Sequence, residues 1–331
     1  MRSCCQCISE NRTRILVWVW REAALLTSWE RLCCGTSEFP RAQGSHAYTH
    51  LDFAEAAVRY GKLGGFAHLM TLVNMLRAQR PGALLLDSGD SWQGSATALW
   101  SQGRDMIAAS KLLGVDFMTG HWEFTYGAAR VEQAIAQELN GSIEFLAQNI
   151  RIADFDDSVF KAYVIREVNG VPVAIIGQAF PYTPIANPRH FVPDWTFGIQ
   201  EERLQKIIDE ARTKGAWLVV LLSHNGMDVD LKHASRVEGL DAILGGHTHD
   251  AVPQPVILRN ARGKTLVTNA GSNGKFIAVL DVDVTRIGVR EHRYQLLPVF
   301  ADVLSADSDM SSLIAKHRAP YAAKLGEKLA I

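Results

Sequence analysis

Two histidines, His247 and His249, stand two residues apart in the run Gly245-Gly246-His247-Thr248-His249-Asp250. In an extended backbone, side chains two residues apart face the same side, so both imidazoles would converge on one spot if the chain is extended here. The glycines allow the backbone to approach a bound ion closely. The competing interpretation is a surface loop that holds two histidines by chance.

Two further residues of metal-binding type follow apolar runs. Asp90 comes shortly after Ala83–Leu86, and His224 comes shortly after Trp217–Leu222. A carboxylate can bridge two divalent ions about 3.5 to 4 Å apart, which together activate a shared water for attack. Taken singly, Asp90 fits a turn and His224 fits an ordinary loop. Their convergence with the histidine pair predicts a dimetal hydrolase.

The elements that must position these side chains alternate between helix and strand. Phe66–Arg77 has the apolar spacing of an amphipathic helix, and Ile199–Arg212 has acidic residues early and basic residues late, as the helix dipole favours. Strands are expected at Ala83–Leu86, Val171–Ile176, Trp217–Leu222, Ala242–Leu244 and Ile277–Val284. The last stretch, Asp307–Leu329, is expected to be a helix interrupted at Pro320. This order predicts an α/β fold whose functional groups lie on loops at strand ends.

Composition sets limits on function. The 331 residues are 47% hydrophobic with a formal net charge of -1, which suits a large core and argues against nucleic acid as a partner. The apolar run Ile15–Trp20 ends at Arg21, far short of the roughly 20 residues that a membrane span needs. No export signal is readable around it.

All the cysteines lie near the start of the chain, at Cys4, Cys5, Cys7, Cys33 and Cys34. Their spacing matches no usual zinc pattern, and no histidine partner follows nearby. We therefore expect no metal site among them.

Three motifs resemble those of the calcineurin-like metallophosphoesterases, particularly the 5′-nucleotidase branch. They are Gly89-Asp90, Ser223-His224-Asn225-Gly226 and the run from Gly245 to Asp250. Where that branch usually carries GNHEFDYG, this chain reads GHWEFTYG from Gly120 to Gly127.

The departures within this fourth motif concern the acid dyad of the phosphoesterases. An ungapped alignment places His121 at a metal-binding Asn, Trp122 at the catalytic His, and Thr125 at the Asp partner of that His. The dyad is therefore missing. The same substitution resembles the SoxB family, the dimanganese thiosulfohydrolases of bacterial thiosulfate oxidation.

The resemblance to the SoxB family extends over roughly residues 47–331. It includes WQGSATALW at 92–100, FLAQN at 145–149 and GQAFPYTPIANPRHFVPDWTFG at 177–198. It implies an αββα sandwich with mixed sheets and hydrolysis of a cysteine-linked thiosulfonate or sulfonate on the SoxYZ carrier, with release of sulfate in the periplasm. A sulfur leaving group with a thiol-like pKa of ~8.5 needs less protonation than an alkoxide, which suits the loss of the dyad.

The resemblance also implies roles for individual residues. Two Mn²⁺ ions are expected, and carboxylate and imidazole ligands also accept zinc or iron. Asp90, His121 and Trp122 form the predicted catalytic group, with Asp90 as the bridging ligand and Trp122 shaping the substrate channel. The predicted metal ligands are Asp90, His121, His224, His247 and His249, and the predicted substrate contacts are Trp122, Asn149, Tyr182, Trp195 and Asn273.

The start of the chain departs from the family, which begins with a strand followed by an Asp-x-His pair. Here Arg14-Ile15-Leu16 could begin such a strand, but Val17-Trp18-Val19-Trp20 follows without Asp or His. We expect residues 1–46 to be a non-matching segment, poorly ordered or artefactual. Residues 47–305 form the predicted catalytic domain, and 306–331 start a helix that in the family leads to a C-terminal domain absent here.

The missing pair and the missing domain change the expected function of this chain. One metal site would lack two ligands, so the chain is expected to hold only one ion. A 5′-nucleotidase-like phosphoesterase on the same metals is one alternative. An inactive fragment that binds a metal or the carrier is another.

Overall fold

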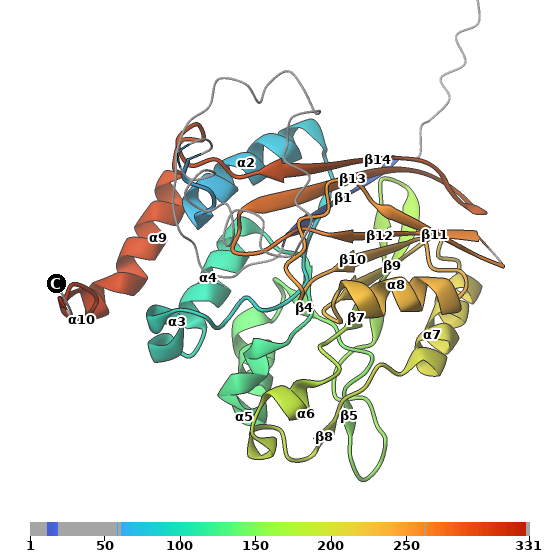
Figure 1. Ribbon diagram of the computed structural model, residues 1–331, viewed down its shortest axis with the longest axis horizontal. Helices are drawn as coiled ribbons and strands as arrows, with labels where there is room; N and C mark the ends of the chain where they lie inside the picture. The colour runs from blue at the N-terminus through green and yellow to red at the C-terminus, as the bar shows by residue number, and fades with distance from the viewer. Residues whose placement is uncertain (1–11, 19–57, 59–60, 262, 329–331) are drawn as a thin grey trace, which may run out of the picture.

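The protein is described by a computed structural model that covers residues 12–18, 58, 61–261 and 263–328. Most strands belong to two six-stranded sheets that lie one above the other (Figure 1). The first sheet contains, in order, β14 (Gly288–Pro298), β13 (Phe276–Thr285), β1 (Arg12–Trp18), β2 (Leu84–Asp87), β3 (Phe117–Met118) and β4 (Glu144–Phe145). The second contains β11 (Val256–Asn260), β12 (Gly263–Asn269), β10 (Ala242–Gly245), β9 (Leu218–Ser223), β7 (Val171–Gln178) and β6 (Tyr163–Val168). A small ribbon pairs β5 (Arg151–Ile152) with β8 (Trp195–Thr196).

Helices cover the outer faces of both sheets. The α-helices are α2 (Phe66–Gln79), α3 (Ala96–Ser101), α4 (Arg104–Leu113), α5 (Ala128–Gln133), α6 (Thr183–Ala186), α7 (Glu201–Thr213), α8 (Met227–Arg236), α9 (Ser308–Arg318) and α10 (Ala322–Leu325). Single turns of 3-10 helix occur at η1 (Trp122–Tyr126), η3 (Arg189–Phe191) and η4 (Ala319–Tyr321), and η2 (Ala134–Leu139) is a π-helix. None of the helices described is long and apolar enough to cross a membrane.

Alternation along the strands explains the layers. In β9, Leu218, Val220 and Leu222 belong to the core between the sheets, whereas Val219 and Leu221 pack with residues of α7 and α8. On the other side, residues of α2 and α4 pack with residues of the first sheet. The result is an αββα sandwich with mixed sheets, as the sequence predicts.

The expected elements are confirmed with small shifts at their ends. The helices expected at Phe66–Arg77 and Ile199–Arg212 correspond to α2 and α7, and the five expected strands correspond to β2, β7, β9, β10 and β13. The interruption of the last helix at Pro320 is also confirmed, because α9 is followed by the 3-10 turn η4 and then by α10. Proline lacks the N–H that a continuous helix would need there.

The strand expected at Arg14-Ile15-Leu16 is present as β1. It pairs antiparallel with β13 and parallel with β2, with Trp18 opposite Asp87 at its end. The rest of the segment 1–46, including all five cysteines, lies outside the described residues. The expectations about that segment therefore stay predictions.

Parallel pairing sets where the site forms. In the first sheet β1, β2, β3 and β4 run parallel, and in the second β7, β9, β10 and β12 do. The carboxyl ends of parallel strands meet at one edge of a sheet, where loops are free to carry ligands.

Candidate metal centre

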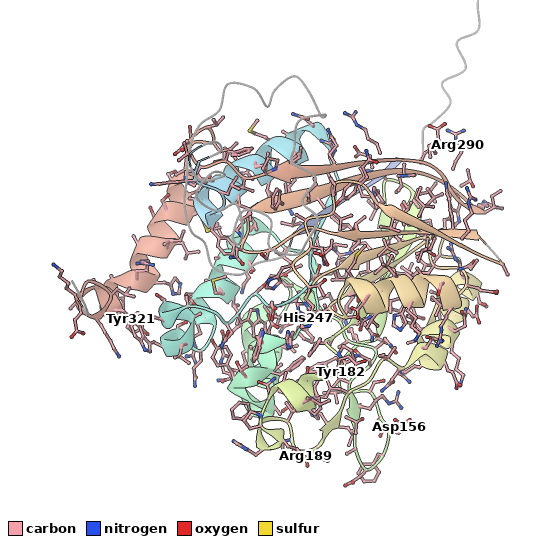
Figure 2. The ribbon with its side chains drawn as sticks, in the orientation of Figure 1. Asp156, Tyr182, Arg189, His247, Arg290 and Tyr321 are labelled. Atoms are coloured by element: carbon pink, nitrogen blue, oxygen red, sulfur yellow. The ribbon has the colours of Figure 1, made fainter. Side chains whose placement is uncertain are left out.

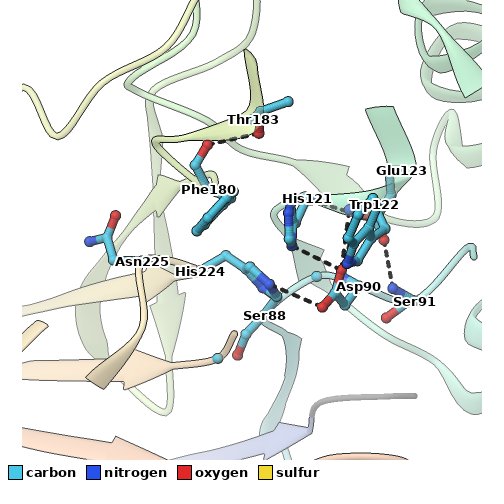
Figure 3. A network of polar contacts seen from close by, with 12 residues as sticks. Ser88, Asp90, Ser91, His121, Trp122, Glu123, Phe180, Thr183, His224 and Asn225 are labelled. Atoms are coloured by element: carbon cyan, nitrogen blue, oxygen red, sulfur yellow. Dashed lines mark hydrogen bonds and ion pairs between the residues drawn. The ribbon is translucent and has the colours of Figure 1, made fainter. Parts of the chain in front are cut away.

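Each predicted ligand lies on a loop directly after a parallel strand. Asp90 follows β2, His121 follows β3, His224 follows β9 and His247 follows β10. Two ligands therefore come from each sheet, and dashed lines in the close-up in Figure 3 join the Asp90 carboxylate to both His121 and His224. The structure thus brings together four of the five predicted metal ligands.

The distances fit a shared cation. One ring nitrogen each of His121, His224 and His247 lie within 4.8 Å of one another. Asp90 Oδ1 is 3.2 Å from His121 Nδ1, and Asp90 Oδ2 is 3.3 Å from His224 Nε2. One carboxylate oxygen of Asp90 therefore faces each of two imidazoles.

Hydrogen bonding orients the ring of His224. Its Nδ1 lies 2.6 Å from the carbonyl oxygen of Ser88, to which it donates, and this leaves Nε2 available as the ligand atom. Within the described part of the chain, His247 Nδ1 is a buried atom without a hydrogen bond, and His224 Nε2 faces the Asp90 carboxylate at 3.3 Å. Buried nitrogen atoms of this kind usually have a partner, and a divalent ion would supply one. The donor set therefore fits a metal.

Electrostatics hold Asp90 and His247 in charge states that suit metal binding. At His224, burial lowers the pKa but the charge of Asp90 outweighs it, so that this pKa is raised until an ion replaces the proton. Burial alone would raise the pKa of Asp90, but the charges and hydrogen bonds of His224 and His121 outweigh it and hold the pKa well below its ordinary value. Burial, followed by the neighbouring His224 and His121, lowers the pKa of His247 to about 3. An ionised carboxylate and a neutral imidazole are the forms that bind metals.

The expectation of an extended backbone through the histidine pair is wrong. Strand β10 ends at Gly245, and both His247 (φ 71°) and His249 (φ 61°) adopt left-handed conformations. The alternation rule for strands therefore does not apply to them. His247 belongs to the converging group and His249 does not, so the role of His249 as a ligand stays a prediction.

Two aromatic rings flank the imidazole of His121. The ring centroid of Trp122 is 4.8 Å from that of His121, and the backbone N–H of Trp122 donates to Asp90 Oδ1 at 3.2 Å. On the other side, the ring of Phe180 is 4.1 Å from His121 and 4.0 Å from His247. Sequence reasoning did not single out Phe180. The feature of the sequence that could have pointed to Phe180 is its position two residues after the end of another buried strand, β7.

The four remaining predicted substrate contacts lie in different settings. Tyr182 is 43% exposed, and its ring is 5.7 Å from Phe180; Figure 2 labels it below His247. Asn149 is buried, and its amide bonds to the backbone at Ala179 and Gly198. Trp195 packs against aromatic rings of the core, and Asn273 lies half-buried in the loop after β12 with a φ of 61°. Contact of any of the four with a substrate stays a prediction.

Comparisons with known proteins agree on one fold. A solved structure of the sulfate thiohydrolase SoxB from Thermus thermophilus is 32% identical, with a TM-score of 0.80, and is matched over 94% of this chain and 61% of that one. A 5′-nucleotidase precursor, also from Thermus thermophilus, is 21% identical, with a TM-score of 0.79, over 96% of this chain and 61% of that one. The second likeness supports the fold alone.

Sequence comparison finds nucleotidases. A snake venom 5′-nucleotidase from Gloydius brevicauda is 30% identical over 239 residues, which are 66% of this chain and 40% of that protein. The human 5′-nucleotidase is 26% identical over 246 residues. The chain spans about two fifths of the length of these relatives, and no family model matches it.

The shared fold, these similarities and the cluster of Asp90 with three imidazoles make the chain similar to the metal-dependent hydrolases of the 5′-nucleotidase and calcineurin-like metallophosphoesterase family.

Proposed function

We propose that this chain belongs to a thiosulfohydrolase of the SoxB type, which acts in the periplasm on a sulfonate carried by a cysteine of SoxYZ. The likeness to the solved SoxB supports this proposal, because it combines 32% identity with 94% coverage of this chain. Manganese is the proposed metal, and Tyr182 and Trp122 are the proposed substrate contacts.

The observation that carries the proposal is the chemistry at Trp122 and Thr125. The resemblance aligns these residues with the His-Asp dyad of phosphoesterases, and neither side chain is a proton donor of that kind. The Thr125 hydroxyl donates to the carbonyl oxygen of Trp122 at 2.7 Å, which ties it to the backbone. The site therefore suits a leaving group that departs without protonation by a dyad.

The reaction balances with water as its only co-substrate. A water oxygen bonds to the sulfonate sulfur, the bond from that sulfur to the carrier sulfur breaks, and its electron pair stays on the carrier as a thiol or persulfide. The products are the carrier, sulfate and a proton. A divalent ion, when bound, would lower the pKa of water enough to supply the nucleophile. Asp90 and the imidazoles of His121, His224 and His247 would hold the ion.

A 5′-nucleotidase is the second candidate, favoured by the curated relatives found by sequence. To choose between them, the purified chain is incubated with Mn²⁺ and either SoxYZ carrying a thiosulfonate or a nucleoside monophosphate. Release of sulfate alone supports the proposal, and release of phosphate alone overturns it. An Asp90→Asn variant, which lacks the central carboxylate, is the control for contaminating activity.

A third outcome would identify an inactive fragment. If the chain binds Mn²⁺ but releases neither anion, its remaining function is binding of the metal or of the carrier. Co-sedimentation of the chain with SoxYZ would distinguish binding of the carrier from binding of the metal alone. That result would overturn the proposed activity for this chain while leaving its metal centre in place.

A further inference from the structure

We propose that Glu123 is a positioning residue that joins the Asp90 loop to the His121 loop and so sets the geometry of the metal ligands before an ion binds. The inference rests on the metal centre of the proposed function, but not on its substrate. The evidence is a set of four hydrogen bonds from two separate loops to one carboxylate.

The two carboxylate oxygens divide their contacts between the loops. Glu123 Oε1 accepts from the backbone N–H groups of Ser91 at 2.6 Å and Trp92 at 3.2 Å. Glu123 Oε2 accepts from the backbone N–H groups of His121 at 2.6 Å and Asp90 at 3.3 Å. Figure 3 shows the Glu123 carboxylate beside Ser91 and Trp122. One side chain thus bonds to the backbone N–H groups of both Asp90 and His121.

Burial makes this arrangement costly to lose. Glu123 is fully buried, so a carboxylate without these bonds would be strongly unfavourable there. Burial, and then the charge of Asp90, raise its pKa, while the N–H groups of His121 and Ser91 lower it. Loss of the carboxylate would in turn leave buried N–H groups of both loops without their acceptor.

The bonds also stabilise an unfavourable backbone conformation. Asp90 has a φ of 68°, a backbone conformation that residues other than glycine rarely adopt. Its N–H is one of the four donors to Glu123. Its carboxylate accepts in turn from the N–H of Trp122, the residue before Glu123. Asp90 is therefore bonded to the His121 loop through both its backbone and its side chain, which fixes where its oxygens point.

The test measures Mn²⁺ binding to the purified chain without any substrate. In Glu123→Gln, the side chain keeps its shape, but its NH₂ group faces backbone N–H groups instead of accepting from them. We expect the dissociation constant for Mn²⁺, measured from the spectrum of free Mn²⁺, to rise 10- to 100-fold, the usual effect of losing a group that orients ligands. Glu123→Asp, which keeps the charge on a shorter side chain, should recover part of this loss.

Glu138→Gln is the matched control. Glu138 forms an ion pair with Arg130 at 2.7 Å and contacts none of the predicted ligands through a hydrogen bond in the described part of the chain. We expect this variant to lose thermal stability but to bind Mn²⁺ within twofold of the unaltered chain. A purely structural role for Glu123 would give it the same pattern as Glu138.

Several outcomes would overturn the inference. Wild-type affinity in folded Glu123→Gln would do so directly. If that variant does not fold, hydrogen exchange of the backbone amides is measured in the unaltered metal-free chain. Ser91 and His121 N–H groups that exchange as fast as those of exposed loops would contradict the hydrogen bonds to Glu123, which we call the Glu123 clamp. No Mn²⁺ binding by the unaltered chain would overturn the metal centre and this inference together. Binding without sulfate release would leave the inference standing and reject only the proposed substrate.

Discussion

At the scale of single residues, the candidate site gathers unfavourable backbone conformations. Asp90, His247, His249 and Asn273 all have φ angles between 61° and 71°, although none is a glycine. Each such conformation costs on the order of 1 to 3 kcal/mol and persists only where surrounding contacts impose it. All four are residues that the sequence marks as functional. Their type could be read from the motifs, but the torsion angles could not, because they depend on contacts between loops that are distant in sequence.

Trp122 and Thr125 allow a direct test of why the phosphoesterase dyad is missing. In the double variant Trp122→His/Thr125→Asp, a proton donor returns beside His121. We expect the rate of phosphate release from a nucleoside monophosphate with Mn²⁺ to rise about 100-fold, since general acid catalysis typically contributes at least that much. Thr125→Asp alone is the control and should give no gain. An unchanged rate in the double variant would mean that these positions do not decide between the two reactions.

At the scale of elements, helix α8 supports the loop that carries His224. Asp230 Oδ1 accepts from the Ser223 hydroxyl at 2.6 Å and from the Asn225 amide at 3.0 Å, so both neighbours of His224 are bonded to this helix. The same amide lies 3.3 Å from Nδ1 of His233. Because an amide nitrogen donates, His233 Nδ1 must accept, and the ring is neutral.

His233 should make stability depend on pH. Burial lowers its pKa to about 4, whereas the unfolded chain has the ordinary value of about 6.5. The unfolded state therefore takes up a proton first, and the free energy of unfolding falls as the pH drops from 6.5 toward 4. At pH 5 this loss is roughly 2 kcal/mol.

The measurement compares urea unfolding of the metal-free chain and of His233→Gln at pH 7 and pH 5. Between pH 7 and pH 5, the free energy of unfolding of the variant should fall by roughly 2 kcal/mol less than that of the unaltered chain. Other buried groups, such as Asp87 and Asp230, titrate in both proteins, so their effects cancel in the difference. Equal pH dependence in the two proteins would show that His233 is not neutral and buried as described.

Strand β7 lies so close to the loop after β4 that only a glycine fits at position 177. A Cβ on Gly177 would overlap the carbonyl group and side chain of Leu146. We expect Gly177→Ala to lower the free energy of unfolding by about 3 kcal/mol or to prevent folding, as overpacking does. The matched control is Gly198→Ala, where the nearest neighbour of the added carbon is a flexible side-chain atom of Gln200 at 3.6 Å. Chemical denaturation that finds equal stabilities would contradict the close packing.

At the scale of the whole molecule, the site exists because two sheets end at the same place. Apolar runs and the polar residues after them predicted β2, β9 and β10 and the loops that follow. Local periodicity could not predict β3 and β4, which are only two residues each, or the pairing of β1 between β13 and β2. For the same reason, the packing of Phe180 against two imidazoles and the clamp by Glu123 came only with the structure. Both depend on contacts between segments more than 30 residues apart.

The expected number of bound metal ions depends on which residues follow the four central parallel strands, β1, β2, β9 and β10. Strands β2, β9 and β10 lead into Asp90, His224 and His247, but β1, which lies beside β2, continues in sequence as Val19-Trp20-Arg21. None of these three side chains is a usual metal ligand. We therefore expect purified chain dialysed against Mn²⁺ to retain one tightly bound ion, measured by elemental analysis against protein concentration. His224→Ala should lower this content well below one, because it removes a ligand that faces Asp90 directly. Two tightly held ions per chain would show that other residues complete a second site and would contradict the single-ion prediction.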